Sequence, residues 1–68
     1  MSTETYTVTG MTCEHCVRSV TEEVSELPGV RDVQVDLASG RLTVTSEQAL
    51  GEPAVRTAVE EAGYQLVG

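Results

Sequence analysis

The apolar residues of this chain alternate between a two-residue spacing and a helical spacing, and this alternation most restricts the fold. The two-residue spacing predicts strands at residues 5–9, 30–37, 41–46 and 64–67. The helical spacing occurs in two segments between them, first at Val17, Val20, Val24 and Leu27, then at Val55, Ala58, Val59 and Ala62. Taken in order, the segments predict an α+β fold of the ferredoxin-like βαββαβ kind. Such a fold has a four-stranded antiparallel sheet with two helices on one face.

Threonine, proline and glycine mark the ends of the predicted helices. The first helix is expected to begin near Thr12 or Cys13, where the threonine hydroxyl can cap free backbone N–H groups. It must end by Leu27, because a Pro-Gly turn follows. In the second helix Pro53 suits the first turn, and Gly63 is placed to end the helix in a left-handed conformation.

The second and third predicted strands form a hairpin. In the strand predicted at residues 30–37, the apolar side chains of Val33, Val35 and Leu37 alternate with polar ones. Residues 38–40 then make a short connection into the strand at residues 41–46.

The two cysteines of the chain, Cys13 and Cys16, stand at the junction between the first strand and the first helix. Free N–H groups and the positive dipole end at a helix start favour a thiolate over a thiol. A soft ion that accepts few ligands suits such a pair, and Cu(I) leads among the ions that thiolates select. Zinc is less suited, because a structural zinc site takes four ligands. A thioredoxin-like redox pair is the main rival to metal binding.

The motif around the cysteines resembles that of the heavy-metal-associated domain. Residues 10–16 read Gly-Met-Thr-Cys-Glu-His-Cys, and the matching features downstream are the apolar helix, Leu-Pro-Gly-Val at 27–30 and Gly-Tyr at 63–64. Within that family the chain is similar to small bacterial copper chaperones and to amino-terminal domains of copper-transporting P-type ATPases. The resemblance covers nearly the whole chain, and its motif is more specific than the cysteine spacing alone.

The resemblance implies that Cys13 and Cys16 bind Cu(I) as thiolates. It implies delivery of the ion, by ligand exchange, to the metal-binding domain of a copper-transporting P-type ATPase. It also implies that Met11 packs under the loop without being a ligand, and that Tyr64 approaches the site from a neighbouring loop. Thr12 stands where relatives that handle zinc or cadmium often carry an acidic residue, which favours copper. The absence of lysine fits the bacterial pattern better than the eukaryotic one.

Three side chains near the motif have alternative roles. For His15 the alternatives are a ligand in a metal site shared between two molecules, a group that tunes the acidity of the cysteines, and an exposed ring without a role. Tyr64 shields the metal or hydrogen-bonds to a cysteine sulfur, or simply packs on the sheet. Arg18 offsets the charge of a bis-thiolate centre or is a solvated helix arginine. We expect a monomer without copper, and the spare ligand capacity of a two-thiolate site allows a copper-bridged dimer.

The length and charge of the chain argue against several classes of function. Its 68 residues suffice for a single domain, residues 1–68, without a deep substrate pocket. The net charge of −7 argues against nucleic acid and anionic membranes as partners. We expect that the protein is not an enzyme and that it does not insert into a membrane. The chain begins without a leader pattern, so the expectation is a free-standing cytoplasmic protein whose thiols stay reduced.

Two alternative functions use the same cysteines. One is a thiol-disulfide oxidoreductase with Cys13 as its nucleophile. Thioredoxin folds, however, need a longer chain and usually a proline-bearing loop facing the cysteines, whereas Pro28 and Pro53 mark a helix end and a helix start. The other alternative is a binding module for mercury or zinc, which competition between metals separates from a copper site.

Overall fold

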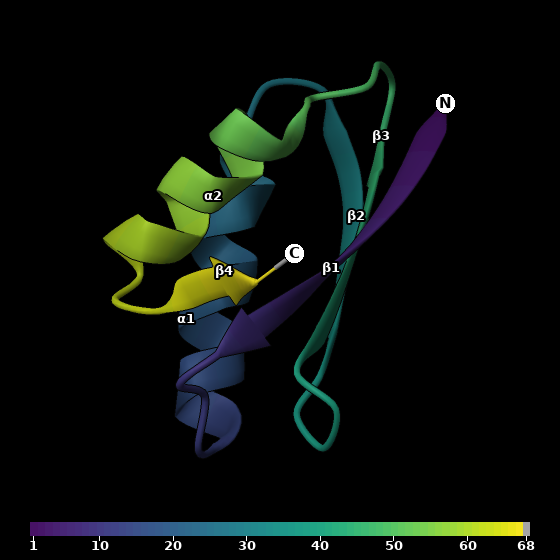
Figure 1. Cartoon of the computed structure of the whole chain (residues 1–68). Helices are drawn as coiled ribbons and strands as arrows, with labels where there is room; N and C mark the ends of the chain where they lie inside the picture. Colours follow the sequence, from purple (N-terminus) through teal and green to yellow (C-terminus); the bar gives the residue numbers. More distant parts are fainter. Residues whose placement is uncertain (68) are drawn as a thin grey trace.

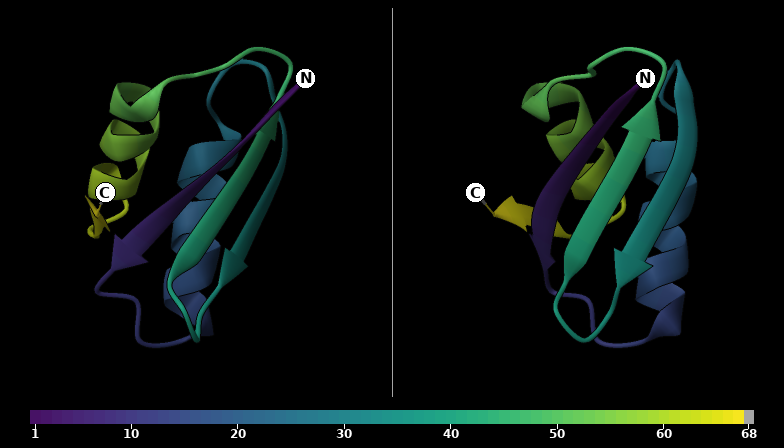
Figure 2. Two further views of the ribbon diagram at one scale, coloured as in Figure 1. Left: turned by 45° about the vertical axis from the view of Figure 1, so that its right-hand side comes forward. Right: turned by 90° about the vertical axis from the view of Figure 1, so that its right-hand side faces the viewer.

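The computed structural model describes residues 1–67 and confirms the predicted fold class. The elements in chain order are β1 (Ser2–Thr9), α1 (Glu14–Ser25), β2 (Val30–Asp36), β3 (Arg41–Ser46), α2 (Glu52–Glu61) and β4 (Gln65–Val67). The strands form one antiparallel sheet in the order β2-β3-β1-β4. Both helices cover the same face of this sheet, as Figure 1 and Figure 2 show. The loop between β1 and α1 lies at the lower end of the molecule in Figure 1.

Valine supplies most of the core between the sheet and the helices. In β1, Tyr6 and Val8 are buried and alternate with exposed threonines, so the strand has one apolar face. The core residues with no exposed surface are Val20, Val24, Leu42, Val55 and Val59. Burying a side chain of this size stabilises a fold by about 1.5–3 kcal/mol. The apolar stripes predicted for both helices therefore pack in the core, where Val17, Leu27 and Ala62 are half-buried.

The first strand is longer than its apolar pattern predicted. β1 begins at Ser2 because its backbone pairs with β3 from Ser2 through Thr7. β4 pairs only with the other end of β1, from Thr7 to Thr9. Backbone pairing with β3 thus brings a polar segment into the sheet without any apolar signal in the sequence.

The prediction that the second strand extends to Leu37 is wrong by one residue. β2 ends at Asp36, and Leu37 is 37% exposed. The Ala38 N–H donates to the Asp36 carboxylate at 3.0 Å, and the Gly40 N–H donates to the Asp36 carbonyl at 2.8 Å. These bonds close the turn directly after Asp36, so the chain leaves the sheet before Leu37 can extend it.

The helix ends agree closely with the sequence prediction. Pro53 lies in the first turn of α2, and Gly63 follows the helix with a φ of 96°. α1 ends at Ser25, before the Pro-Gly turn. Within residues 1–67 neither helix is long and apolar enough to cross a membrane.

Gly40 joins the β2–β3 turn to the central strand. Its φ is 72°, and its carbonyl accepts the Val8 N–H at 2.7 Å. A Cβ at this position would lie 2.6 Å from the Val8 backbone oxygen. Gly29 has a similar φ of 84°, but a Cβ there would meet nothing within 4 Å. Gly29 is therefore required only by its left-handed backbone, whereas Gly40 is also required because a Cβ would clash with the Val8 backbone.

Replacing each glycine by alanine should separate these two costs. Gly29→Ala is expected to lower the free energy of unfolding by about 1–2 kcal/mol, the cost of a left-handed residue with a Cβ. Gly40→Ala adds a clash with backbone, so we expect a loss of roughly 2–4 kcal/mol. Urea unfolding of both variants measures the difference. Equal losses would show that the approach of Gly40 to Val8 has no energetic weight.

Candidate metal centre

The loop after β1 brings the two predicted ligand residues together at the start of α1. The sulfurs of Cys13 and Cys16 are 3.6 Å apart. Cys13 is the residue that precedes the helix, with an extended backbone (φ −158°, ψ 174°). Its carbonyl accepts the N–H groups of Cys16 at 3.1 Å and Val17 at 3.3 Å, which fixes the first helical turn. Cys13 is exposed and Cys16 is half-buried, so the pair is open to solvent from one side.

Thr12 does not cap the helix, contrary to the sequence prediction. The capping position belongs to Cys13, and no side chain there bonds a free N–H group of α1. The Thr12 hydroxyl lies instead 3.8 Å from the Cys16 sulfur, at the i,i+4 spacing. The threonine therefore faces the sulfur of Cys16, a role that the sequence did not indicate.

The thiol of Cys16 is markedly acidic, with its pKa lowered to about 6. The largest cause is hydrogen bonding from the Thr12 backbone, and the next is the Tyr64 hydroxyl, whose approach falls short of a regular hydrogen bond. Partial desolvation opposes these effects, and Cys13 adds smaller favourable ones. The interaction with Cys16 also raises the pKa of Tyr64. Near neutral pH Cys16 is therefore mostly thiolate, the form that binds metals.

Met11 and Tyr64 support the loop from the core side. Met11 is half-buried and packs against the hydrophobic core, as the family resemblance implied. Tyr64 also packs against the core, and its N–H donates to the Val59 carbonyl at 3.1 Å. A Cβ at Gly10 would lie 3.3 Å from the Tyr64 ring, so the ring sits close against the start of the loop. The sequence had placed Tyr64 near the site but gave no sign of its contact with Gly10.

His15 and Arg18 lie on the exposed side of the first helical turns. The His15 carbonyl accepts the Ser19 hydroxyl at 3.1 Å, whereas its ring makes no hydrogen bond among residues 1–67. Within the same range, no three His, Cys, Asp or Glu side chains are grouped so that they could hold a metal ion. The site as folded thus offers two sulfurs and no third ligand of these types.

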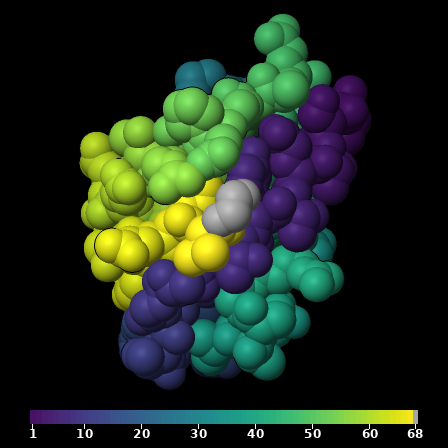
Figure 3. Space-filling view, in the orientation of Figure 1, coloured from purple at the N-terminus to yellow at the C-terminus, as the bar shows by residue number. Residues whose placement is uncertain are grey.

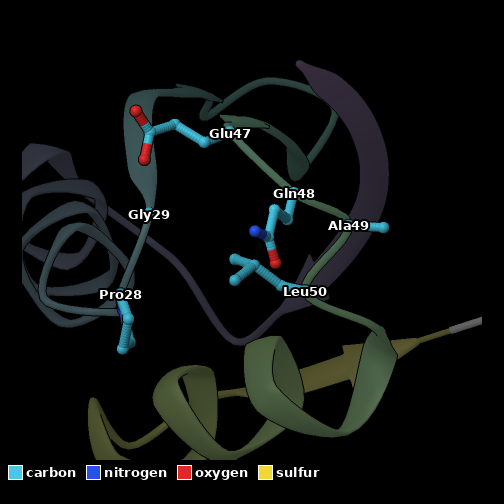
Figure 4. Close-up of a pocket in the computed structure, with 6 residues that line it drawn as sticks. All are labelled: Pro28, Gly29, Glu47, Gln48, Ala49 and Leu50. Atoms are coloured by element: carbon cyan, nitrogen blue, oxygen red, sulfur yellow. The ribbon is translucent and has the colours of Figure 1, made fainter.

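One pocket of the molecule lies far from the cysteines. It encloses about 430 Å³ and is lined by Pro28, Gly29, Glu47, Gln48, Ala49 and Leu50. The lining residues come from two segments, 28–29 and 47–50, and Figure 4 shows Gln48 and Leu50 extending into the space between them. These segments lie at the upper end of the molecule in Figure 1, opposite the cysteine loop.

Comparisons with known proteins agree with this geometry. The model of the heavy-metal-associated domain family matches residues 5–65. The copper chaperone CopZ of Staphylococcus saprophyticus is 36% identical over 67 residues, which cover 97% of this chain and 98% of that protein. Copper-transporting ATPase 2 of Rhizobium meliloti is 45% identical over 60 residues, 84% of this chain but only 7% of the ATPase. A solved CopZ metallochaperone superposes with a TM-score of 0.88 at 30% identity, covering 97% of this chain and 100% of that one.

The pKa of Cys16 can be tested in the reduced, metal-free protein. The alkylation rate of Cys16 should rise with pH about a midpoint near 6, because the thiolate is the reactive form. Tyr64→Phe removes a group that favours the thiolate, so the midpoint should move upward toward the ordinary range of a thiol. Mass spectrometry after timed alkylation distinguishes Cys16 from Cys13. Tyr6→Phe, which changes a tyrosine in the core, is the matched control, and an equal shift in that variant would contradict the assigned cause.

Proposed function

This chain belongs to the heavy-metal-associated domain family, and we propose that it is a cytoplasmic copper chaperone that binds Cu(I) through Cys13 and Cys16. We propose further that it delivers the ion to the metal-binding domain of a copper-transporting P-type ATPase. The observation that carries this proposal is the pair of sulfurs 3.6 Å apart at an exposed helix start. The similarity over nearly full length to a copper chaperone supports it, as does the match to a small part of a copper-transporting ATPase.

The donor set favours Cu(I) over zinc. Two thiolates satisfy a soft ion of low coordination number, whereas structural zinc sites take four ligands. Among residues 1–67 no cluster offers the further His, Cys, Asp or Glu ligands that zinc requires. Copper binds sulfur in its deprotonated form, so a cysteine that is still a thiol must lose its proton on binding. The low pKa of Cys16 reduces the cost of this deprotonation near neutral pH.

Transfer to a partner follows from the exposure of the cysteines. A thiolate of the acceptor forms a bond to the copper as a third sulfur ligand, and one of the two copper–sulfur bonds in this chain then breaks. A second exchange of the same kind leaves the ion on the acceptor and both cysteines of this chain free to take up protons. The copper remains Cu(I) throughout, so no electron is transferred and no bond of a substrate is cut.

The same ligand capacity bears on self-association. A two-thiolate copper site accepts another sulfur from a second copy of the chain as readily as from an acceptor. We therefore propose a monomer without metal and a copper-bridged dimer at high loading, with His15 exposed beside the shared ions. Sedimentation at increasing copper loading tests this part, and a monomer at every loading would remove it.

One observation favours a second function, thiol-disulfide exchange by the oxidoreductase route. Cys16 has a low pKa and its sulfur lies beside that of Cys13, as in a redox-active pair. Against it, Pro28 lines the pocket at the far end of the molecule and Pro53 lies in the first turn of α2, so neither faces the sulfurs. Turnover of a disulfide substrate would be the mark of this alternative.

Removing one thiol should separate the ligand assignment from the fold. Cys13→Ser and Cys16→Ser are each expected to lower the Cu(I) affinity more than about a hundredfold, because changing groups that merely surround a ligand already costs 10–100-fold. His15→Ala is the matched control and should retain stoichiometric binding. An anaerobic Cu(I) titration against a competing chelator, repeated with Zn(II), measures the affinities. Tight stoichiometric copper binding by Cys16→Ser would contradict the site.

Delivery can be tested with an isolated metal-binding domain of a copper-transporting ATPase as acceptor. The copper-loaded chain is mixed with this domain in a buffer that contains no small-molecule thiol. It should give up its copper in proportion to the relative affinities of the two sites. Copper content after separation of the two proteins measures the transfer. If the copper stays on this chain although the acceptor binds it more tightly, the chain stores copper and does not deliver it.

A further inference from the structure

The half of β1 remote from the metal loop has an unpaired backbone edge. β4 covers only Thr7 to Thr9, so from Ser2 to Tyr6 the strand is paired on the β3 side alone among residues 1–67. In Figure 3 the purple residues of β1 extend to the upper right, beyond the yellow residues of β4 and beside the green start of α2. Proteins usually protect such edges with proline, lysine, a bulge or an inward-pointing charge, and in this segment Glu4 is the one such device. This segment, Ser-Thr-Glu-Thr-Tyr, contains neither proline nor lysine.

The hydrogen bond of Val8 shows which peptide groups face the open edge. The Val8 N–H donates to Gly40 on the β3 side, at 2.7 Å. Alternate residues of a strand direct their N–H and C=O groups to opposite sides. Thr3 and Thr5 therefore direct both groups away from β3, toward the edge that β4 does not reach. Their side chains are exposed on the face of the sheet that the helices leave open.

Acidic side chains lie beside this edge, on the helix side of the sheet. Glu4, between the two threonines, points inward and is half-buried. Glu52 opens the first turn of α2. The Tyr6 side chain is only 9% exposed, and its hydroxyl is buried without a hydrogen-bond partner among residues 1–67. Burial, then Glu4, and less strongly Glu52, raise the pKa of Tyr6, and neither carboxylate forms a regular hydrogen bond with the Tyr6 hydroxyl.

We propose that this edge binds an extended, basic segment of a partner protein, which adds a strand beside Thr3 and Thr5 and sets a lysine or arginine against Glu4. Strand addition takes its affinity from main-chain hydrogen bonds and its specificity from alternate side chains. An inward-facing residue opposite Glu4 lies beside the Glu4 carboxylate and the buried hydroxyl of Tyr6. A cation at that position meets the negative charge of Glu4, whereas the Glu52 carboxylate is already paired with Arg56.

A second copy of the chain fits the same edge poorly. Antiparallel pairing of two copies about the middle of the open segment places Glu4 of one opposite Glu4 of the other. Like charges directly opposite one another on a sheet are destabilising. Each copy also carries a net charge of −7, which adds a long-range repulsion between copies and an attraction for a basic partner.

Binding at this edge leaves the cysteines free. The open half of β1 and the cysteine loop lie at opposite ends of the sheet, as Figure 1 shows. A partner that holds the edge keeps the chain nearby while the sulfurs stay exposed, which raises the effective concentration for any second contact. The proposal does not depend on copper and is tested without it.

The test is amide hydrogen exchange of the metal-free protein with a short synthetic peptide of alternating lysine and valine. The bound peptide should slow exchange at the Thr3 and Thr5 amides by about tenfold or more, because these groups gain acceptors. Thr5→Pro removes one of these free N–H groups without touching the β3 ladder, so binding should be lost while the fold remains. Glu4→Gln should weaken binding about three- to fivefold. Glu23→Gln, the same charge change on α1, is the matched control and should bind as the unaltered chain does.

Several outcomes would overturn the proposal. A peptide of alternating glutamate and valine that binds equally well would remove the role of charge. Slowed exchange along α1, with Thr3 and Thr5 unchanged, would place the peptide on the acidic helix surface instead. Protection of Thr3 and Thr5 that grows with protein concentration alone would show that a second copy occupies the edge. If the lysine peptide does not bind at all, the proposal that this edge binds a basic segment is wrong.

Discussion

Pairing of β1 with both of its neighbours is the interaction on which the rest of the structure depends. β1 holds β3 along most of its length and β4 at its end, so without it the sheet separates into a hairpin and a single short strand. The same strand carries Tyr6 and Val8 into the core and leads directly into the loop with the cysteines. The position of the sulfurs is therefore fixed by a strand in the middle of the sheet, although they are themselves exposed.

Periodicity predicted the parts of the fold that burial determines, and missed the parts that backbone geometry determines. The buried positions of both helices and of β3 follow the apolar spacing in the sequence. Ser2 joins β1 only through backbone pairing with β3, for which a polar sequence gives no signal. Leu37 is apolar but leaves the sheet, because the side chain and carbonyl of Asp36 close a turn before it. In both cases hydrogen bonds of the backbone, joined at Asp36 by one to its side chain, set the end of the strand where the apolar pattern did not.

The candidate site shows the same division. The spacing of Cys13 and Cys16 at a strand-to-helix junction was sufficient to predict that their sulfurs meet, because the first turn of a helix brings residues three apart to one side. The role of Thr12 was not predictable in this way. A threonine before a helix is usually read as a cap, yet Cys13 occupies that position and Thr12 turns its hydroxyl to the Cys16 sulfur. Contacts to a soft sulfur follow no spacing rule that a sequence displays.

Local hydrogen bonding outweighs overall charge at Cys16. A net charge of −7 disfavours another anion, and both sulfurs lie in that field. The surface charges act through solvent, however, and at physiological ionic strength their effect fades beyond about 8 Å. The Thr12 backbone and the Tyr64 hydroxyl are the local groups with the largest effect, and they hold the pKa of Cys16 low in spite of the acidic surface. An acidic protein can therefore present a thiolate at neutral pH, provided that the groups around the sulfur are fixed by the strand before it and by the core beneath it.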